Sequence, residues 1–339
     1  MIKSLSRSHL GLPPNKIIDV ELLEEDNFKS FYTISIPDGH NPCFPQYIFH
    51  AVGPAEPFYK TASEVATLSY LRENTSIPVP RVIAHSPTAE NELGCEWILM
   101  ENIPGIALAD VWNSINLETK TNVIKDLAGF ARQLRDPKQH HDTIGNIYFR
   151  EDISDEEHTS PVGDGKYVIG PIVTSLVLID RKLGGSRDNW TFTNEKDYVA
   201  FMTTLRMELL GKSADVGDIR DAENIIKWVN EPQPTSAETF PSPSDFFLLL
   251  HEDLSLDNII IHPGTHKIEG IINWAGAGSR PHWEDPYPEF LEGPEVEGEV
   301  EPPSPEDTDK LARREDWEKM KLRLVFDHEC GGLNFKVEQ

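Results

Sequence analysis

Cysteine is scarce in this chain. Only three occur among 339 residues, Cys43, Cys95 and Cys330, and they lie far apart. Such spacing matches neither the dense framework of a disulfide-stapled domain nor the paired ligands of a zinc site. Because disulfides persist mainly in oxidising compartments, this scarcity favours a reducing intracellular compartment, and we expect the protein to be cytoplasmic.

Long hydrophobic runs are also missing. A helix that spans a bilayer needs roughly 18 or more consecutive apolar residues. The longest candidate, Tyr167 to Ile179, is shorter than that and is broken by Gly170 and Pro171. The first residues include basic side chains but no apolar segment of a secretory signal. The sequence therefore predicts neither a membrane span nor an export signal.

Basic residues are few relative to acidic ones. The chain has 31 Lys and Arg against 57 Asp and Glu, which gives a formal net charge of −26. A protein that binds nucleic acid needs a basic surface to neutralise phosphates. The charge balance therefore argues against a nucleic-acid partner.

The excess of acid is concentrated in one segment. Residues 284–309 contain eleven acids and no Lys or Arg, and they are rich in proline and glycine. This composition is typical of a solvated, mobile insert. Two alternatives remain open from the sequence: a surface that binds a cationic substrate, and a docking site for a basic protein partner.

The length and the apolar patterns together predict the architecture. A chain of 339 residues exceeds what one compact core usually holds. We predict an α+β fold of two lobes, a small β-rich lobe at residues 1–103 and a large, mainly helical lobe at 104–339. A cleft between two such lobes is a common place for a ligand.

The apolar periodicity locates the expected elements. Thr61 and Glu64 have the spacing of a capping box at a helix start, and the chain before about Pro14 is expected to be loosely ordered. The expected strands lie within 17–36 and at 46–52, 96–100 and 246–250, and the expected helices lie at 61–73, 123–135, 194–210 and 222–230.

One short motif carries the predicted chemistry. The segment HEDLSLDNIII, from His251 to Ile261, directly follows an apolar strand. Phosphoryl transfer needs a carboxylate that orients the attacking hydroxyl and accepts its proton, and oxygen ligands for magnesium. Asp253 suits the first role and the amide oxygen of Asn258 the second, while His251 would orient the loop. The simpler alternative is that Asp253 and Asn258 are turn-forming residues after a strand.

This segment resembles the catalytic loop of the aminoglycoside phosphotransferase and choline kinase-like family, which has a protein-kinase-like fold. Three further segments match in the right order: YKTASEVATLSYLRENTSIPVPRVIAHS, EWILMENIPG and HPGTHKIEGIINWAGAG. The resemblance runs from about Ile17 to Phe326. It implies transfer of a phosphoryl group from ATP, with Mg²⁺, to a hydroxyl of a small molecule.

The resemblance also implies roles for individual residues. Asp253 would be the catalytic base and His251 its orienting neighbour. Asn258 and Asn273 would hold the metal. The phosphates would be held by Glu64 with Lys60 or His50, and adenine would meet backbone groups at Glu101 and Ile103.

Three positions depart from the family pattern. Asn273 stands where the family has the aspartate that binds magnesium, so one full negative charge is missing; at about 4 Å and an effective dielectric of ~20 this removes roughly 4 kcal/mol of attraction. His50 stands near the place of the strand Lys or Arg, and neutral histidine is a poor replacement. The turn at 24–31 has no glycine and carries Glu24, Glu25 and Asp26.

These departures leave three functions open. The first is an active phosphotransferase, whose substrate the sequence does not reveal. The second is a pseudokinase that binds a nucleotide or a protein without turnover. The third is a scaffold whose acidic segment docks a partner. A separate pair, His140 and His141, lies in a polar stretch and is expected to be exposed rather than to bind metal.

Overall fold

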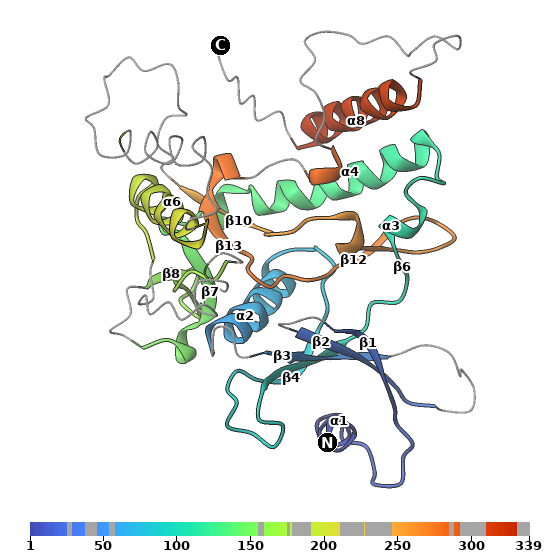
Figure 1. Cartoon of the computed structure of the whole chain (residues 1–339), viewed down its shortest axis with the longest axis vertical. Helices are drawn as coiled ribbons and strands as arrows, with labels where there is room; N and C mark the ends of the chain where they lie inside the picture. The colour runs from blue at the N-terminus through green and yellow to red at the C-terminus, as the bar shows by residue number, and fades with distance from the viewer. Residues whose placement is uncertain are drawn as a thin grey trace.

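The described residues form three sheets, and one helix lies between the N-terminal sheet and a sheet of the C-terminal part (Figure 1). The structure is a computed structural model. The described residues are 1–25, 29–37, 46–53, 58–154, 159–174, 177, 191–210, 227, 246–284, 288–291 and 310–330.

The first sheet forms the N-terminal part of the molecule. Its five strands run in the order β1-β2-β3-β5-β4 with every neighbouring pair antiparallel. The strands are β1 (Asp19–Glu25), β2 (Lys29–Ser35), β3 (Tyr47–Val52), β4 (Val82–Ser86) and β5 (Glu96–Glu101). They confirm the strands expected within 17–36, at 46–52 and at 96–100.

Side chains alternate between the two faces of this sheet, as the period of two residues in a strand requires. Phe49, Trp97 and Leu99 lie in one apolar cluster, and helix α1 (Ile2–His9) packs on it through Ile2 and Leu5. The expectation of a loosely ordered N-terminus is therefore wrong for these residues. The reason is that α1 covers an apolar sheet face that would otherwise meet water.

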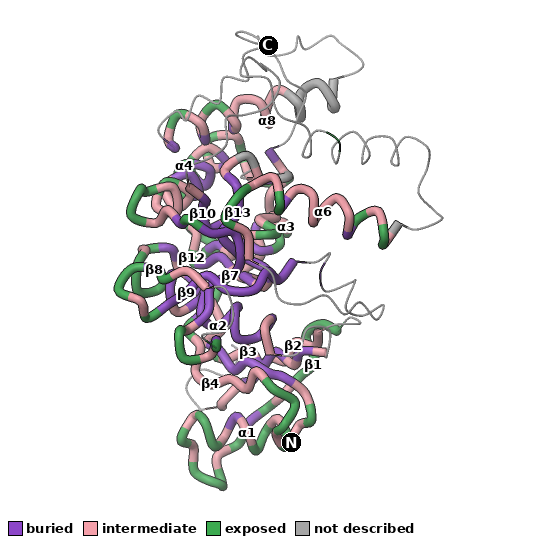
Figure 2. Tube along the Cα trace, turned by 90° about the vertical axis from the view of Figure 1, so that its left-hand side faces the viewer, coloured by how far each residue is buried: buried purple, intermediate pink, exposed green. Residues whose placement is uncertain are grey.

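Helix α2 (Tyr59–Asn74) covers the opposite face. Val65 packs against Ile98 and Met100 of β5, while other residues of the helix lie in the large cluster of the C-terminal part. Eleven of its sixteen residues are buried, so little of the helix faces solvent (Figure 2). The helix begins two residues before the predicted start, at Tyr59, and its N-cap makes no side-chain hydrogen bond. The predicted capping box is therefore wrong, and Glu64 is instead a buried side chain.

The remainder of the chain combines helices with two further sheets. One has five strands in the order β10-β13-β7-β9-β8, and the other has three in the order β12-β11-β6. This is more sheet than the apolar patterns led us to expect, because strands of three or four residues such as Gly278–Pro281 are too short to show a period.

The elements of this part have the following bounds. The strands are β6 (Ile106–Ala107), β7 (Gly145–Phe149), β8 (Ser160–Val162), β9 (Tyr167–Gly170), β10 (Phe247–Leu250), β11 (Ile259–Ile261), β12 (Ile268–Ile271) and β13 (Gly278–Pro281). The helices are α3 (Leu108–Val111), α4 (Leu117–Leu134), α6 (Glu195–Leu210) and α8 (Lys310–Glu329). Short 3₁₀ turns are η1 (Pro137–Gln139), η2 (Arg150–Asp152), η4 (Leu256–Asn258), η5 (His282–Glu284) and η6 (Glu289–Leu291).

Helices α4 and α6 and strand β10 confirm three of the predicted elements. The helix predicted at 222–230 lies outside the described residues apart from Lys227, and most of the acidic segment 284–309 lies outside them too. None of the described helices has the length and apolar character needed to cross a bilayer.

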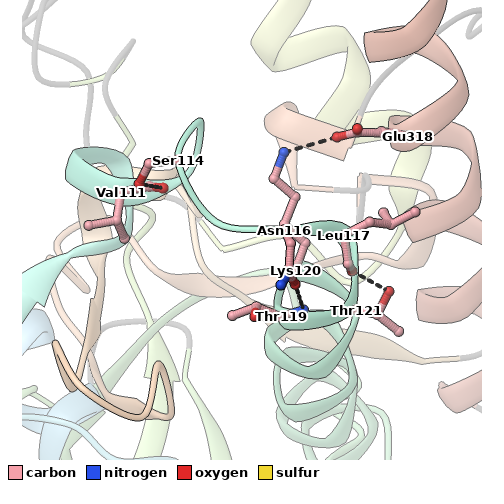
Figure 3. A network of polar contacts seen from close by, with 8 residues as sticks. All are labelled: Val111, Ser114, Asn116, Leu117, Thr119, Lys120, Thr121 and Glu318. Atoms are coloured by element: carbon pink, nitrogen blue, oxygen red, sulfur yellow. Dashed lines mark hydrogen bonds and ion pairs between the residues drawn. The ribbon is translucent and has the colours of Figure 1, made fainter.

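Helices α4 and α8 lie side by side at the end of the molecule farthest from α1 (Figure 1). Their polar contact is an ion pair between Lys120 Nζ and a carboxylate oxygen of Glu318 at 3.0 Å (Figure 3). The two side chains are only 11% and 19% exposed, and the ammonium also lies 5.0 Å from the ring centre of Trp112. At the start of α4, Asn116 accepts a hydrogen bond from the backbone N–H of Thr119 and caps the helix.

We expect Glu318→Gln to lower the free energy of unfolding by about 1 to 2 kcal/mol, because it leaves the mostly buried Lys120 ammonium without its charged partner. Urea unfolding at low and high salt measures this. Arg81→Gln is the matched control, because Arg81 pairs with Glu101 at a site where the two side chains are 52% and 40% exposed. The control should have the smaller effect, and an equal loss in both variants would contradict the prediction.

Candidate functional site

The predicted catalytic loop lies between β10 and β11. Asp253 is exposed, and Asn258 is buried at the end of η4. The amide nitrogen of Asn258 donates to the Asp253 backbone carbonyl at 2.8 Å, to its carboxylate at 2.9 Å and to Ser255 Oγ at 3.1 Å. These donations fix the orientation of the amide. They also hold one carboxylate oxygen of Asp253 in place while the group stays accessible.

His251 connects this loop to the segment that follows β12. Its Nδ1 accepts from the Asp253 backbone N–H at 3.1 Å, so the ring proton is on Nε2, which donates to the Ile272 carbonyl at 2.9 Å. Burial lowers the pKa of His251 to about 4, although the Ile272 carbonyl opposes this. The ring is therefore neutral at physiological pH. Both contacts hold the backbone of the loop, and the predicted orienting role of His251 stays a prediction.

Asn273 lies directly beyond those contacts. The backbone N–H of Ile272 donates to the Asn258 carbonyl at 3.0 Å, so the two segments are bonded side by side. Asn273 itself has a φ of 63°, in the left-handed region where Asn and Asp are the usual non-glycine residues. Trp274 is buried, donates from its indole N–H to the Ile271 carbonyl and packs edge-on against His251. Asn273 therefore follows a residue that is hydrogen-bonded to Asn258, and the metal-binding role of both asparagines stays a prediction.

A buried network of hydrogen bonds holds residues 276 and 277, which follow Asn273. Arg280 donates to the carbonyls of Gly145 at 2.8 Å and Gly276 at 3.3 Å. Asn146 donates to the Ala277 carbonyl at 2.9 Å and accepts from Arg280 at 3.2 Å. The sequence analysis did not identify either residue, because neither belongs to a local motif. Together they fix the turn that follows Asn273.

The residues of the N-terminal sheet and α2 that are predicted to bind the nucleotide form a buried cluster. His50 of β3 and Glu64 of α2 are both buried, and His50 Nδ1 lies 3.9 Å from Glu64 Oε2. The ring of Phe31 stacks on His50 with 4.3 Å between ring centres. Burial holds the pKa of His50 well below its usual range, and the charges of Lys60 and Lys29 lower it further. Burial also raises the pKa of Glu64, against the opposing effect of the same lysines.

The histidine is therefore neutral and does not replace the missing strand cation. Both ring nitrogens of His50 and one carboxylate oxygen of Glu64 have no hydrogen-bond partner among the described residues. Buried polar atoms without partners are costly. These atoms of His50 and Glu64 could accept or donate hydrogen bonds to a bound ligand or water.

Lys60 lies close to this pair. It is only 6% exposed, and its charge partly opposes the burial that raises the pKa of Glu64 and of Glu96. An exposed Lys60 at the start of a helix is the alternative to a functional role. That alternative is wrong, because α2 is buried along its first turns. Contact of Lys60 with phosphate stays a prediction.

The segment Glu101 to Ile103 connects the first sheet to β6. The backbone N–H groups of Glu101 and Asn102 already donate to the carbonyls of Arg81 and Gln46. The Ile103 side chain lies against Gly270 of β12, where an added Cβ would be 2.1 Å from Ile103 Cδ1. The adenine contacts predicted for Glu101 and Ile103 stay predictions. They would use the carbonyl of Glu101 and the backbone groups of Ile103.

The donor atoms test whether a magnesium ion suits this site. Asn258 and Asn273 offer two amide oxygens, and amide oxygens are hard ligands. Among the described residues no group of three or more His, Cys, Asp or Glu side chains could hold a metal. The residues therefore fit magnesium in atom type but supply little charge. Phosphate oxygens would have to provide most of the attraction.

The family assignment follows from comparison with known proteins. A profile of the Phosphotransferase enzyme family (APH) matches residues 46–287. The chain belongs to this family. The match includes β3, α2, the connecting segment and both segments that carry Asp253, Asn258 and Asn273.

Individual relatives of this phosphotransferase-family chain are distant. A subtelomeric hrmA-associated cluster protein of Aspergillus fumigatus is 29% identical over 94% of this chain and 69% of its own length. The mitochondrial protein called altered inheritance of mitochondria protein 9, from Meyerozyma guilliermondii, is 26% identical over 63% of this chain and 39% of its own length.

Solved structures support the phosphotransferase fold. A Ralstonia eutropha protein assigned as an aminoglycoside phosphotransferase aligns with a TM-score of 0.53 at 13% identity, over 97% of this chain and 79% of its own. Aminoglycoside 2′-phosphotransferase-IIIa aligns with a TM-score of 0.50 at 14% identity, over 97% and 85%. The expected kinase-like fold with a β-rich N-terminal sheet is thereby confirmed.

One expectation about histidines is wrong. His141 is 7% exposed, because its backbone bridges to Phe247, and burial lowers its pKa to about 4. His140 stacks on Phe246 with 3.7 Å between ring centres. The polar sequence around the pair hid both contacts, since their partners lie more than 100 residues away.

The His251 contacts predict its titration. The ring should carry its proton on Nε2 at pH 7 and should titrate with a pKa of about 4. The bond from Asp253 N–H needs an unprotonated Nδ1, so it should be intact above pH 6.5 and be lost as the pH falls through about 4. Two-bond ¹H–¹⁵N NMR, with His251→Gln to assign the signal, measures both. Titration near pH 6.5 or a proton on Nδ1 would contradict the assignment.

Proposed function

We propose that this chain transfers a phosphoryl group from ATP to a hydroxyl group of a small molecule. The observation that carries the proposal is the exposed carboxylate of Asp253, held by the amide of Asn258 and linked through His251 to the segment of Asn273. Family membership supports phosphoryl transfer as the reaction class. The acceptor and a cytoplasmic location are proposals on the same footing.

Asp253 would act as the general base. The carboxylate oxygen that does not bond to Asn258 receives the proton of the acceptor hydroxyl. The hydroxyl oxygen of the acceptor bonds to the γ-phosphorus, and the bond between the γ-phosphorus and the oxygen that bridges to the β-phosphate breaks. Asn258 keeps the carboxylate oriented, because its amide donates to the other oxygen. His251 keeps the backbone of the loop in register with Ile272.

Nucleotide and metal binding would use the residues named above. Aminoglycoside 2′-phosphotransferase-IIIa was solved as a GDP complex, which supports a nucleotide as the donor. Magnesium, when bound, would neutralise charge on the phosphates, with Asn258 and Asn273 as its protein ligands. Glu101 and Ile103 would meet the base, and Lys60 would be the cation nearest the phosphates.

We expect Asp253→Asn to reduce phosphoryl transfer by at least about 100-fold, since general-base catalysis contributes roughly 10²- to 10⁴-fold. Transfer of labelled phosphate from ATP to a panel of small alcohols measures this. Asp257→Asn is the control, because Asp257 is an exposed acid of the same loop. A native protein whose transfer is unchanged by Asp253→Asn would disprove the assigned base.

A second candidate is a pseudokinase that binds a nucleotide or a protein without turnover. It is favoured by the neutral, buried His50 in place of a strand cation and by Asn273 in place of a carboxylate. A scaffold that docks a basic partner on the acidic segment 284–309 is a separate, third candidate, and most of that segment lies outside the described residues.

Nucleotide-dependent stability separates the two candidates. With ATP at about 1 mM and a dissociation constant near 10 µM, stabilisation should approach ~2.7 kcal/mol. For an active enzyme we expect the increase in Tm to need magnesium, and Asn273→Asp to strengthen that dependence. An increase without magnesium dependence, together with transfer that appears only in Asn273→Asp, would favour the pseudokinase.

A further inference from the structure

A cavity of about 170 Å³ lies beside the catalytic loop, and we call it the α4 cavity. It is lined by Leu127, Phe130 and Leu134 of helix α4 and by apolar residues of β10. Figure 1 shows these two elements as neighbours. Trp274 and Phe326 complete the apolar part of the lining.

The polar groups of the lining are few, and their positions are known. Asp253, His251 and Glu252 belong to it, and the Glu252 carboxylate lies against Gly276. The two ring nitrogens of His251 are engaged by backbone groups, so the ring presents carbon atoms to a ligand. Arg135 lies with its guanidinium 5.8 Å from the ring centre of Phe326. The exposed carboxylate of Asp253 is thus the base that a hydroxyl beside the cavity would meet.

The size of the cavity limits what it can hold. An engineered cavity of about 150 Å³ with apolar walls stays free of water and binds benzene. The α4 cavity is slightly larger, and its lining is mainly apolar but also includes Arg135, Glu252 and Asp253. It suits one aromatic ring or a short alkyl chain, and it offers little to a polar sugar ring, whose hydroxyls would lose their hydrogen bonds to water.

We propose that the α4 cavity binds the apolar part of the acceptor, so that acceptors of this enzyme carry an aromatic ring or a short alkyl chain next to the hydroxyl that meets Asp253. This inference rests on the proposed function, because the ligand is an acceptor only if the protein transfers a phosphoryl group. Binding in the cavity, in contrast, can be measured without nucleotide or turnover.

Calorimetry with benzyl alcohol as the probe tests the binding step. Glycerol, which has hydroxyls but no apolar part, is the comparison ligand. Ala131→Phe places a ring in the cavity, since Ala131 lines it, and should weaken benzyl alcohol binding at least tenfold. Arg132→Phe adds the same ring at the exposed neighbouring position and should leave binding unchanged. If Ala131→Phe fails to fold, Ala131→Val replaces it, with a smaller loss expected.

Two results would overturn the binding step: benzyl alcohol that binds no more tightly than glycerol, or binding that Ala131→Phe and Ala131→Val leave unchanged. Transfer assays test the acceptor step. Phosphorylation of benzyl alcohol that falls with Ala131→Phe but not with Arg132→Phe supports it. Phosphorylation of polar acceptors alone, with kcat/KM unaffected by Ala131→Phe, overturns the acceptor step and leaves the proposed function intact. Absence of all transfer, despite binding, disproves the proposed function instead.

Discussion

The burial of α2 between the N-terminal sheet and β7 is the constraint on which the rest of the molecule depends. The helix supplies apolar contacts in both directions, and Lys60 and Glu64 are carried into the interior with it. Interior charges lose hydration that only close partners can replace. The raised pKa of Glu64 and the lowered pKa of His50 both follow from that loss of water.

The two sides of the site therefore differ in their electrostatics. On the side of the catalytic loop, Asp253 faces solvent and is held by hydrogen bonds, so a full negative charge is available there. On the side of the N-terminal sheet, Phe31 and the surrounding core exclude water from His50. On that side the positive charge comes from Lys60 and Lys29, which act on His50 and Glu64, and not from a cation on β3 itself.

Local sequence predicted those parts of the protein whose contacts are local. The loop from His251 to Asn258 and the helix at 117–134 follow from spacing along the chain, and the structure places them accordingly. The network of Arg280 and Asn146 could not be predicted, because it joins residues 134 positions apart. The capping box failed for a related reason: Thr61 and Glu64 have the right spacing, but packing against two sheets decided where α2 begins. For His141, a polar neighbourhood in sequence concealed a buried position in space.

The contact between Ile103 and Gly270 also limits how the protein can change over time. A side chain at position 270 would meet the Ile103 side chain, so any residue larger than glycine there requires Ile103 to shift. Replacement of Gly270 alone would press on Ile103 in the segment that connects the first sheet to β6. These positions should therefore covary among homologues, with a smaller residue at 103 accompanying any replacement of the glycine.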